Sequence, residues 1–133
     1  MLTNFKIDQV ASFPAGVIFL ACEPKLAFGG GSQERTPAGD WKWDVHLLVG
    51  LRNQFGALGF DTLKVGYISE TQANPLVDLM PQTPVTMTDF EVGVMEKTKK
   101  LPDGSEKVIG VNVWYRAKEI RSTAVTTPKS SAA

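Results

Sequence analysis

Residues 41–50, WKWDVHLLVG, decide the fold class because apolar and polar side chains alternate along them. In an extended chain one face would carry Trp41, Trp43, Val45, Leu47 and Val49, and the other Lys42, Asp44, His46 and Leu48. A period of two residues is typical of a β-strand with one side against a core. The stretch therefore predicts a strand in a mainly β protein.

Other segments on both sides of this strand have a similar composition, rich in β-branched and aromatic residues and bounded by Gly or Pro. They are residues 5–10 with 16–23 as a first strand, then 60–71, 85–97 and 108–120. Gly93 suggests a bulge, and the turn signal LPDG at 101–104 predicts a hairpin between the last two strands. The sequence thus predicts five strands, with a long glycine-rich loop over residues 24–40.

A short helix is expected between the third and fourth strands. Asn74 and Pro75 form a cap and first-turn pair, and the apolar residues up to Met80 would cover one side. Five strands with a helix in this place match the element order of the OB-fold, a partly open Greek-key barrel. An open β-sandwich is the rival architecture, because alternation cannot distinguish a closed barrel from two packed sheets.

The composition fits one globular domain, with 133 residues of which 43% are hydrophobic and 21% charged. We expect the domain to span residues 1–121 and residues 122–133 to form a disordered polar tail. Cys22 is the single cysteine, so neither an internal disulfide nor a cysteine metal cluster can form. With no secretory signal and no apolar run that could cross a bilayer, a cytoplasmic, non-membrane location is expected.

The formal net charge of zero hides a division along the chain. Residues 1–96 hold 6 Lys and Arg against 11 Asp and Glu, whereas residues 97–133 hold 8 against 3. Because charges act locally in salt solution, the basic last segment can attract phosphates although the whole chain is neutral.

The strand order over about residues 5–121, the stretch TPVTMTDFEVGV and the closing VNVWYRAKEI resemble small OB-fold single-stranded-DNA-binding proteins of phages, plasmids and other mobile elements. The resemblance implies a role in DNA replication and an oligomeric protein. The housekeeping members of this class in bacteria usually end in an acidic tail with a hydrophobic tip, whereas this chain ends in PKSSAA. Recruitment of partners through such a tail is therefore not expected.

The closing strand carries the main candidate site. If Val111, Val113, Tyr115 and Ala117 face the core, then Asn112, Trp114, Arg116 and Lys118 line the opposite face. An indole beside two cations suits single-stranded nucleic acid, because unpaired bases stack on aromatic rings and phosphates pair with cations. The alternative is that Trp114 packs against the tail or the long loop while the cations are merely solvated.

Further candidate residues lie in the loop, the inner strands and the hairpin. They are Arg35, Trp41, Lys42, Lys64, Lys97, Lys99, Lys100 and Lys107. A lysine-rich hairpin tip can also serve only to keep strand edges soluble. Trp43 is expected in the core, and Trp41, at the start of its strand, is the freer indole.

Catalysis has little support in the sequence. His46 has no neighbouring partner in the pattern, Cys22 ends an apolar strand, and GGG at 29–31 lacks the Lys-Ser/Thr pair of a phosphate-binding loop. We expect no catalytic residue, no metal and no cofactor.

Two functions therefore remain. The first is sequence-tolerant binding of single-stranded DNA, or of single-stranded nucleic acid more widely. The second is a non-enzymatic assembly or accessory module that binds itself or another protein through the same surface. A small barrel that encloses a ligand has the weakest support, because the expected interior is simply hydrophobic.

Overall fold

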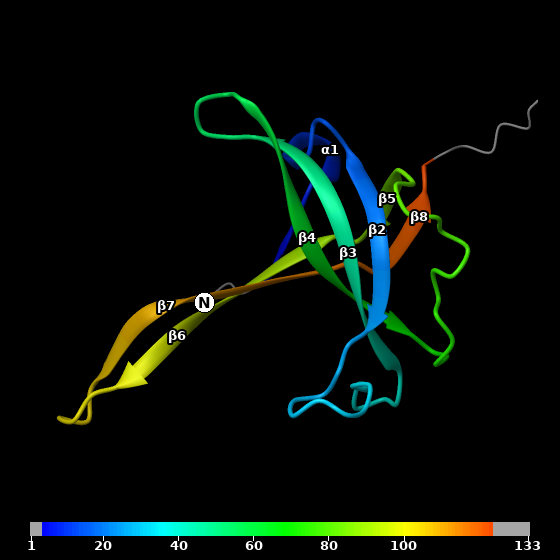
Figure 1. Cartoon of the computed structure of the whole chain (residues 1–133). Coiled ribbons are helices and arrows are strands. Elements are labelled where there is room, and N and C mark those ends of the chain that lie inside the picture. Colours follow the sequence, from blue (N-terminus) through cyan, green and yellow to red (C-terminus); the bar gives the residue numbers. More distant parts are fainter. Residues whose placement is uncertain (1–3, 124–133) are drawn as a thin grey trace, which may run out of the picture.

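The computed structural model describes residues 4–123, which form strands almost throughout (Figure 1). The strands are β1 (Asn4–Lys6), β2 (Val17–Pro24), β3 (Trp41–Arg52), β4 (Leu58–Ser69), β5 (Val85–Thr88), β6 (Glu91–Lys100), β7 (Glu106–Arg116) and β8 (Glu119–Ser122). The mainly β class is confirmed. The count of five strands is wrong, because the described residues form eight.

Six of the strands form one curled sheet in the order β1-β6-β7-β4-β3-β2, and β5 and β8 pair in a small second sheet. Neighbouring strands are antiparallel except β4 and β7, which run parallel. The curl brings β2 back to the segment before β5, where Phe19 N–H donates to the Thr83 carbonyl at 2.8 Å. Gln82 N–H in turn donates to the Phe19 carbonyl at 2.6 Å, so the sheet is a half-barrel partly closed on this side.

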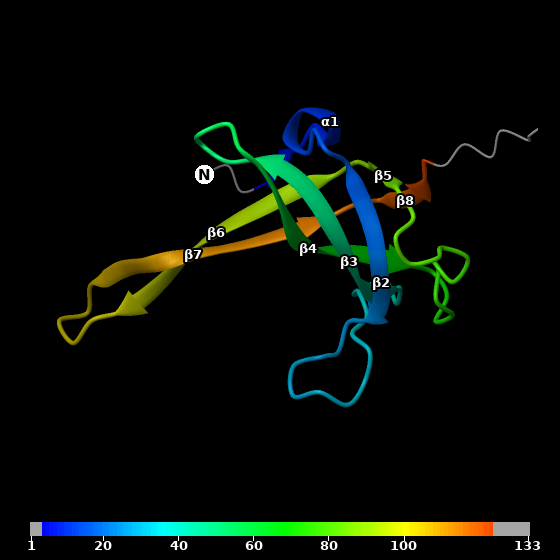
Figure 2. The same ribbon diagram turned by 45° about the horizontal axis from the view of Figure 1, so that its top comes forward.

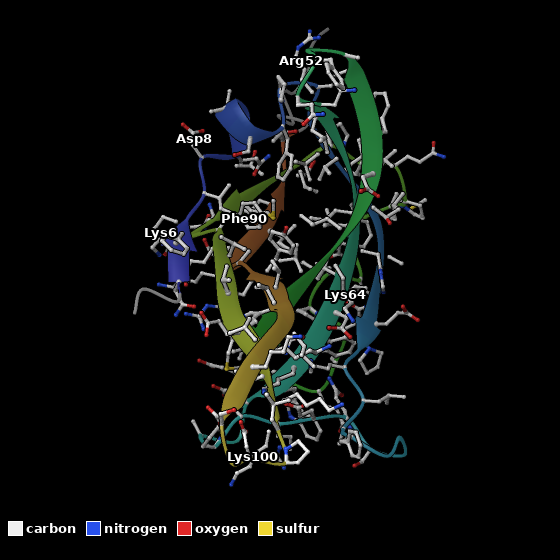
Figure 3. All side chains as sticks on the ribbon, turned by 90° about the vertical axis from the view of Figure 1, so that its left-hand side faces the viewer. Lys6, Asp8, Arg52, Lys64, Phe90 and Lys100 are labelled. Carbon is white, nitrogen blue, oxygen red and sulfur yellow. The ribbon has the colours of Figure 1, made fainter. Side chains whose placement is uncertain are left out.

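The core lies inside the curl and uses the face of β3 that the alternation predicts. Trp43, Val45, Leu47 and Val49 are buried, and Trp41 at the strand's beginning is half-buried. From the other strands come Val17, Phe19, Val65, Leu76, Val85, Met87, Phe90, Ala117 and Ile120. Phe90 points into this interior (Figure 3), 6.0 Å from the ring of Tyr115 between centroids.

Of the three extra strands, β1 is separated from β2 by α1, and the other two arise because two long strands bend out of the large sheet. Residues 85–97 divide into β5 and β6 near Asp89, whose φ of 50° is left-handed. Residues 108–120 divide after Arg116, and Lys118 N–H donates to the Thr88 carbonyl at 2.8 Å. Residues 85–88 and 119–122, at the outer ends of the two expected hairpin strands, thus both depart from the large sheet and pair with each other as β5 and β8.

The irregularity in this strand pair is not at Gly93. Gly93 lies in regular register opposite Trp114, and the register shifts between Lys97 and Thr98 instead. The expectation of a bulge at Gly93 is therefore wrong. The close fit of Gly93 against Trp114 accounts for a glycine in this position, as described below.

The short helix expected over residues 74–80 does not form. Residues 75–78 make turns, because Asn74 Oδ1 accepts the Leu76 N–H at 2.9 Å and prolines follow at 81 and 84. Leu76 still reaches the core, so the segment covers the interior without helical structure. The described α-helix, α1 (Gln9–Ser12), lies instead where extended chain was expected.

The long loop over residues 24–40 is ordered as a hairpin-like excursion. Ala27 N–H donates to the Ser32 carbonyl at 2.9 Å and Glu34 N–H to the Lys25 carbonyl at 2.7 Å.

Among residues 4–123, no helix is long and apolar enough to span a membrane. The polar tail expected over residues 122–133 lies outside the described residues from position 124 onward.

Candidate functional site

A fork in the large sheet creates an open groove. β4 and β7 pair only at Val65 with Tyr115 and Gly66 with Arg116. Beyond these pairs the two strands separate, and β6 and β7 continue as a two-stranded arm that projects from the body (Figures 1 and 2). The groove at the fork is open and has a volume of about 1000 Å³. Of the sequence-predicted candidates, its lining includes Lys42, Lys64, Trp114, Arg116 and Lys118.

Strand register places Lys64, Trp114 and Arg116 on the outer face of the sheet. Directly paired residues share a face, so Arg116 lies on the side of Gly66, opposite the buried Val65 and the half-buried Tyr115. Two residues along β4, Lys64 lies on the same side as Gly66. Trp114, two residues from Arg116 along β7, lies on the same side as Arg116. The indole therefore faces away from the core.

Trp114 lies against the backbone of Gly93 on β6. A Cβ atom added to Gly93 would come within 2.1 Å of indole Cε2 and 2.3 Å of Nε1. The side chain at position 93 must therefore be absent for the ring to lie where it does. Trp114 remains 38% exposed. The backbone of β6 therefore supports one side of the indole ring, and the rest of the ring faces solvent.

The other face of β7 differs from expectation. Tyr115 is half-buried and Ala117 is buried, as predicted, but Val111 is 54% and Val113 50% exposed. The expectation that Val111 and Val113 lie in the core is wrong, because this part of β7 belongs to the arm and has no body beneath it.

Two of the candidate cations are already compensated by acids. Arg116 donates to Glu91 Oε1 through Nε at 3.0 Å and Nη2 at 2.8 Å, and Lys6 reaches the other oxygen of Glu91 at 2.8 Å. These hydrogen bonds hold the pKa of Glu91 below its ordinary value. Lys42 is similarly paired with Glu34, whose pKa is lowered by that contact.

The remaining candidate lysines are uncompensated. Lys64, Lys118 and the four lysines of the arm make no ion pair within residues 4–123. The groove itself is mixed in charge, since Asp40, Asp44, Glu70, Asp89 and Glu91 also line it. The uncompensated positive charge is thus concentrated at Lys64 and Lys118 and along the arm.

The arm separates its charges between two faces. Alternation from Gly93 along β6 puts Lys97 and Lys99 on the Trp114 side, and Lys107 joins them because it pairs with Lys99. Glu96, Lys100 and Glu106 fall on the other side. We call the first side, with Trp114, Lys97, Lys99 and Lys107, the basic face. Between Trp114 and the end of β6 it carries no acidic residue.

Trp41 and Arg35 form a separate contact. The Arg35 guanidinium lies 4.2 Å from the centroid of the Trp41 ring, and its Nη2 donates to the Gly39 carbonyl at 2.8 Å. Neither residue lines the groove. The structure therefore joins them to each other and not to Trp114.

Groups suited to catalysis or metal binding are sparse in the described chain. No three His, Cys, Asp or Glu side chains among residues 4–123 gather closely enough to hold a metal. His46 Nε2 lies 2.6 Å from Glu23 Oε1. Burial, followed by the nearby charges of Asp44 and Glu23, raises the pKa of Cys22 to about 11. Its thiol is therefore protonated, and a weak nucleophile, at neutral pH.

Sequence reasoning missed three residues of the site. Gly93 supports the indole, Glu91 holds Arg116, and Lys6 from β1 reaches the same carboxylate. The alternation of FEVGV against VNVWYR could have paired Gly93 with Trp114 if the register had been known. Lys6 comes from a three-residue strand that has no pattern of its own.

No protein-family model matches the sequence, and no curated protein matches it either.

Proposed function

We propose that the chain binds single-stranded nucleic acid without sequence preference, with single-stranded DNA as the ligand to test first. The observation that carries the proposal is the basic face, where a supported, exposed indole and three uncompensated lysines share one side of a projecting arm. Bases that are not paired can stack on the ring, and the flexible lysines can follow the phosphates.

The strand connectivity supports an OB-fold-like barrel as the framework. Strands β2, β3, β4, β6 and β7 are ordered β6-β7-β4-β3-β2 in space, with β4 and β7 parallel. In OB-folds the face of the second and third strands, with the loops that join strands one to two and four to five, binds oligonucleotides. The corresponding strands here are β3 and β4, which bring Lys42 and Lys64 to the groove.

The contacts of each residue indicate whether it would stack on bases or contact phosphates. Stacking falls to Trp114, because Trp43 is 4% exposed and Trp41 is covered by Arg35. Phosphate contacts are assigned first to the uncompensated lysines of the groove and the basic face, which are Lys64, Lys118, Lys97, Lys99 and Lys107. Arg116 is held by Glu91 and therefore positions the base of the arm more than it neutralises phosphate.

The test is the affinity of Trp114→Ala for a fluorescein-labelled oligo-dT, measured by anisotropy. Loss of one stacked base should weaken binding by about 1–3 kcal/mol. Trp41→Ala is the matched control, because it removes an indole outside the groove and should leave affinity nearly unchanged. Equal affinities of wild type and Trp114→Ala would contradict the proposal.

Protein assembly is a second candidate function. It is favoured by the exposed valines on the side of the arm opposite the basic face, among them Val111 and Val113. A surface of this kind attracts protein more readily than it attracts a polyanion.

A further inference from the structure

We propose that the side of the arm opposite the basic face is a contact between two copies of this chain, related by a two-fold axis. This side, the valine face, consists of Val94, Glu96, Thr98 and Lys100 on β6 and Glu106, Val108, Val111 and Val113 on β7. The proposal does not rest on nucleic-acid binding, since it concerns the other side of the arm.

The valine face has little cover within its own chain. Val108, Val111 and Val113 are 53%, 54% and 50% exposed, although Val is usually a core residue. Within residues 4–123 both edges of the arm are also unpaired, because there β1 pairs with β6 only at residues 91–93 and β4 with β7 only at residues 115–116. A two-stranded ribbon in water is only marginally stable alone. A second layer against the valine face would supply the missing cover.

The charges on the valine face complement each other in a second copy. Glu96 and Lys100 lie two residues before and two residues after Thr98 on one face of β6. A two-fold axis through Thr98, with the arms antiparallel and face to face, brings Glu96 of each copy opposite Lys100 of the other. The same operation places Val108 beside its own copy, because Val108 pairs with Thr98. In an isologous contact of this type the surface must match itself: Glu96 meets Lys100 and Val108 meets Val108, while Glu106, which pairs with Lys100, lies opposite Val111.

Nucleic acid is a poor occupant for this side. Of the three charged residues on the strands of the valine face, Glu96 and Glu106 are acidic and only Lys100 is basic. A polyanion would meet apolar side chains and like charge there. Two copies joined by their valine faces would instead keep both basic faces outward.

The first experiment compares two neighbouring residues on β7 by sedimentation velocity without nucleic acid. Val111→Glu places a charge on the valine face, whereas Asn112→Glu places the same charge on the basic face. Wild type and Asn112→Glu should sediment as a dimer of the 14.5 kDa chain, and Val111→Glu as a monomer. Both positions are exposed, so folding should persist and circular dichroism checks it.

A second experiment tests the antiparallel geometry by charge reversal. Glu96→Lys alone would set lysine against Lys100 in the dimer, and Lys100→Glu alone would set glutamate against Glu96, so each variant should be weakened as a dimer. Mixed in equal amounts, the two variants should form a heterodimer, because both cross-contacts are then attractive. The pairing of position 100 with Glu106 within one arm is the same before and after mixing.

Three results would overturn the proposal. One is a wild-type chain that is still monomeric at a protein concentration of about 1 mM, because a dimer that is dissociated at that concentration is very weak. Another is a dimer that Val111→Glu leaves intact. The third is a mixture of the charge-reversed variants that is no heavier than either alone. None of these results depends on DNA, so failure here is distinguishable from failure of the nucleic-acid proposal.

Discussion

At the scale of single residues, the absence of a side chain at Gly93 decides the position of Trp114. The φ of Gly93 lies outside the left-handed region, so alanine would fit the backbone there. The added methyl group would nevertheless overlap the indole, with contacts of 2.1–2.4 Å. The ring would have to move off the strand, and it would lose the support that orients it for stacking.

We therefore expect Gly93→Ala to weaken binding to oligo-dT nearly as much as Trp114→Ala, by about 1–3 kcal/mol. Gly110→Ala is the matched control, because it adds the same methyl group to the arm where no atom lies within 4 Å. Anisotropy titrations would give the affinities, and tryptophan emission would report the displaced ring. Unchanged affinity in Gly93→Ala, with a shifted indole, would show that the ring's placement does not matter.

Cys22 gives a second prediction at this scale. Its pKa is raised to about 11 from an ordinary value of 9.0, because burial disfavours the thiolate and Asp44 and Glu23 add negative charge. A raised pKa in the folded protein means that little thiolate is present at pH 8. The rate of alkylation by iodoacetamide should thus keep rising through pH 9 toward about 11, while circular dichroism shows the chain still folded. A rate that levels off near pH 9 would contradict the assignment.

At the scale of elements, α1 fixes the small second sheet to the rest of the molecule. β5 pairs with β8 along one edge, and Gln9 at the start of α1 takes the place of a strand along the other. Its Nε2 donates to the Val85 carbonyl at 3.0 Å, and its Oε1 accepts the Met87 N–H at 2.8 Å. One side-chain amide thus satisfies two backbone groups of β5.

Gln9→Ala should lower the free energy of unfolding by about 1–3 kcal/mol, because it leaves these partly buried backbone groups unpaired. Gln72→Ala, at an exposed position, is the control and should change stability by less than about 0.5 kcal/mol. Urea denaturation followed by circular dichroism measures both. Equal midpoints for the two variants would mean that α1 does not support β5.

Strands were predictable from the sequence where one side of the strand faces the core. The alternation in residues 41–50 gave the buried face of β3 because each second residue must leave water. The division into β5 and β8 was not predictable, because it depends on a pairing between residues 85–88 and 119–122 that are distant in sequence. The expected helix over 74–80 failed for a local reason, since side-chain turn bonds and nearby prolines compete with so short a helix.

At the scale of the whole molecule, the curled sheet places a mixed-charge groove beside an arm with one basic face. The outward position of Trp114 was predictable from alternation in the closing strand. The pairing of Arg116 with Glu91, and of Lys42 with Glu34, was not, because it requires knowledge of which strands and loops are neighbours. Counting cations in the sequence therefore overstates how many can neutralise phosphates.

The direct measurement is the affinity of the wild-type chain for poly-dT, followed by tryptophan fluorescence over a series of salt concentrations. With the five lysines at positions 64, 97, 99, 107 and 118 as phosphate contacts, log affinity should fall with log salt with a slope of about −3.5, or roughly 0.7 per phosphate. Tryptophan emission should be quenched on binding, and the quenching should be lost in Trp114→Ala. Tryptophan emission that poly-dT leaves unchanged at low salt, or an affinity that does not depend on salt, would contradict the binding of single-stranded nucleic acid by the basic face and the groove.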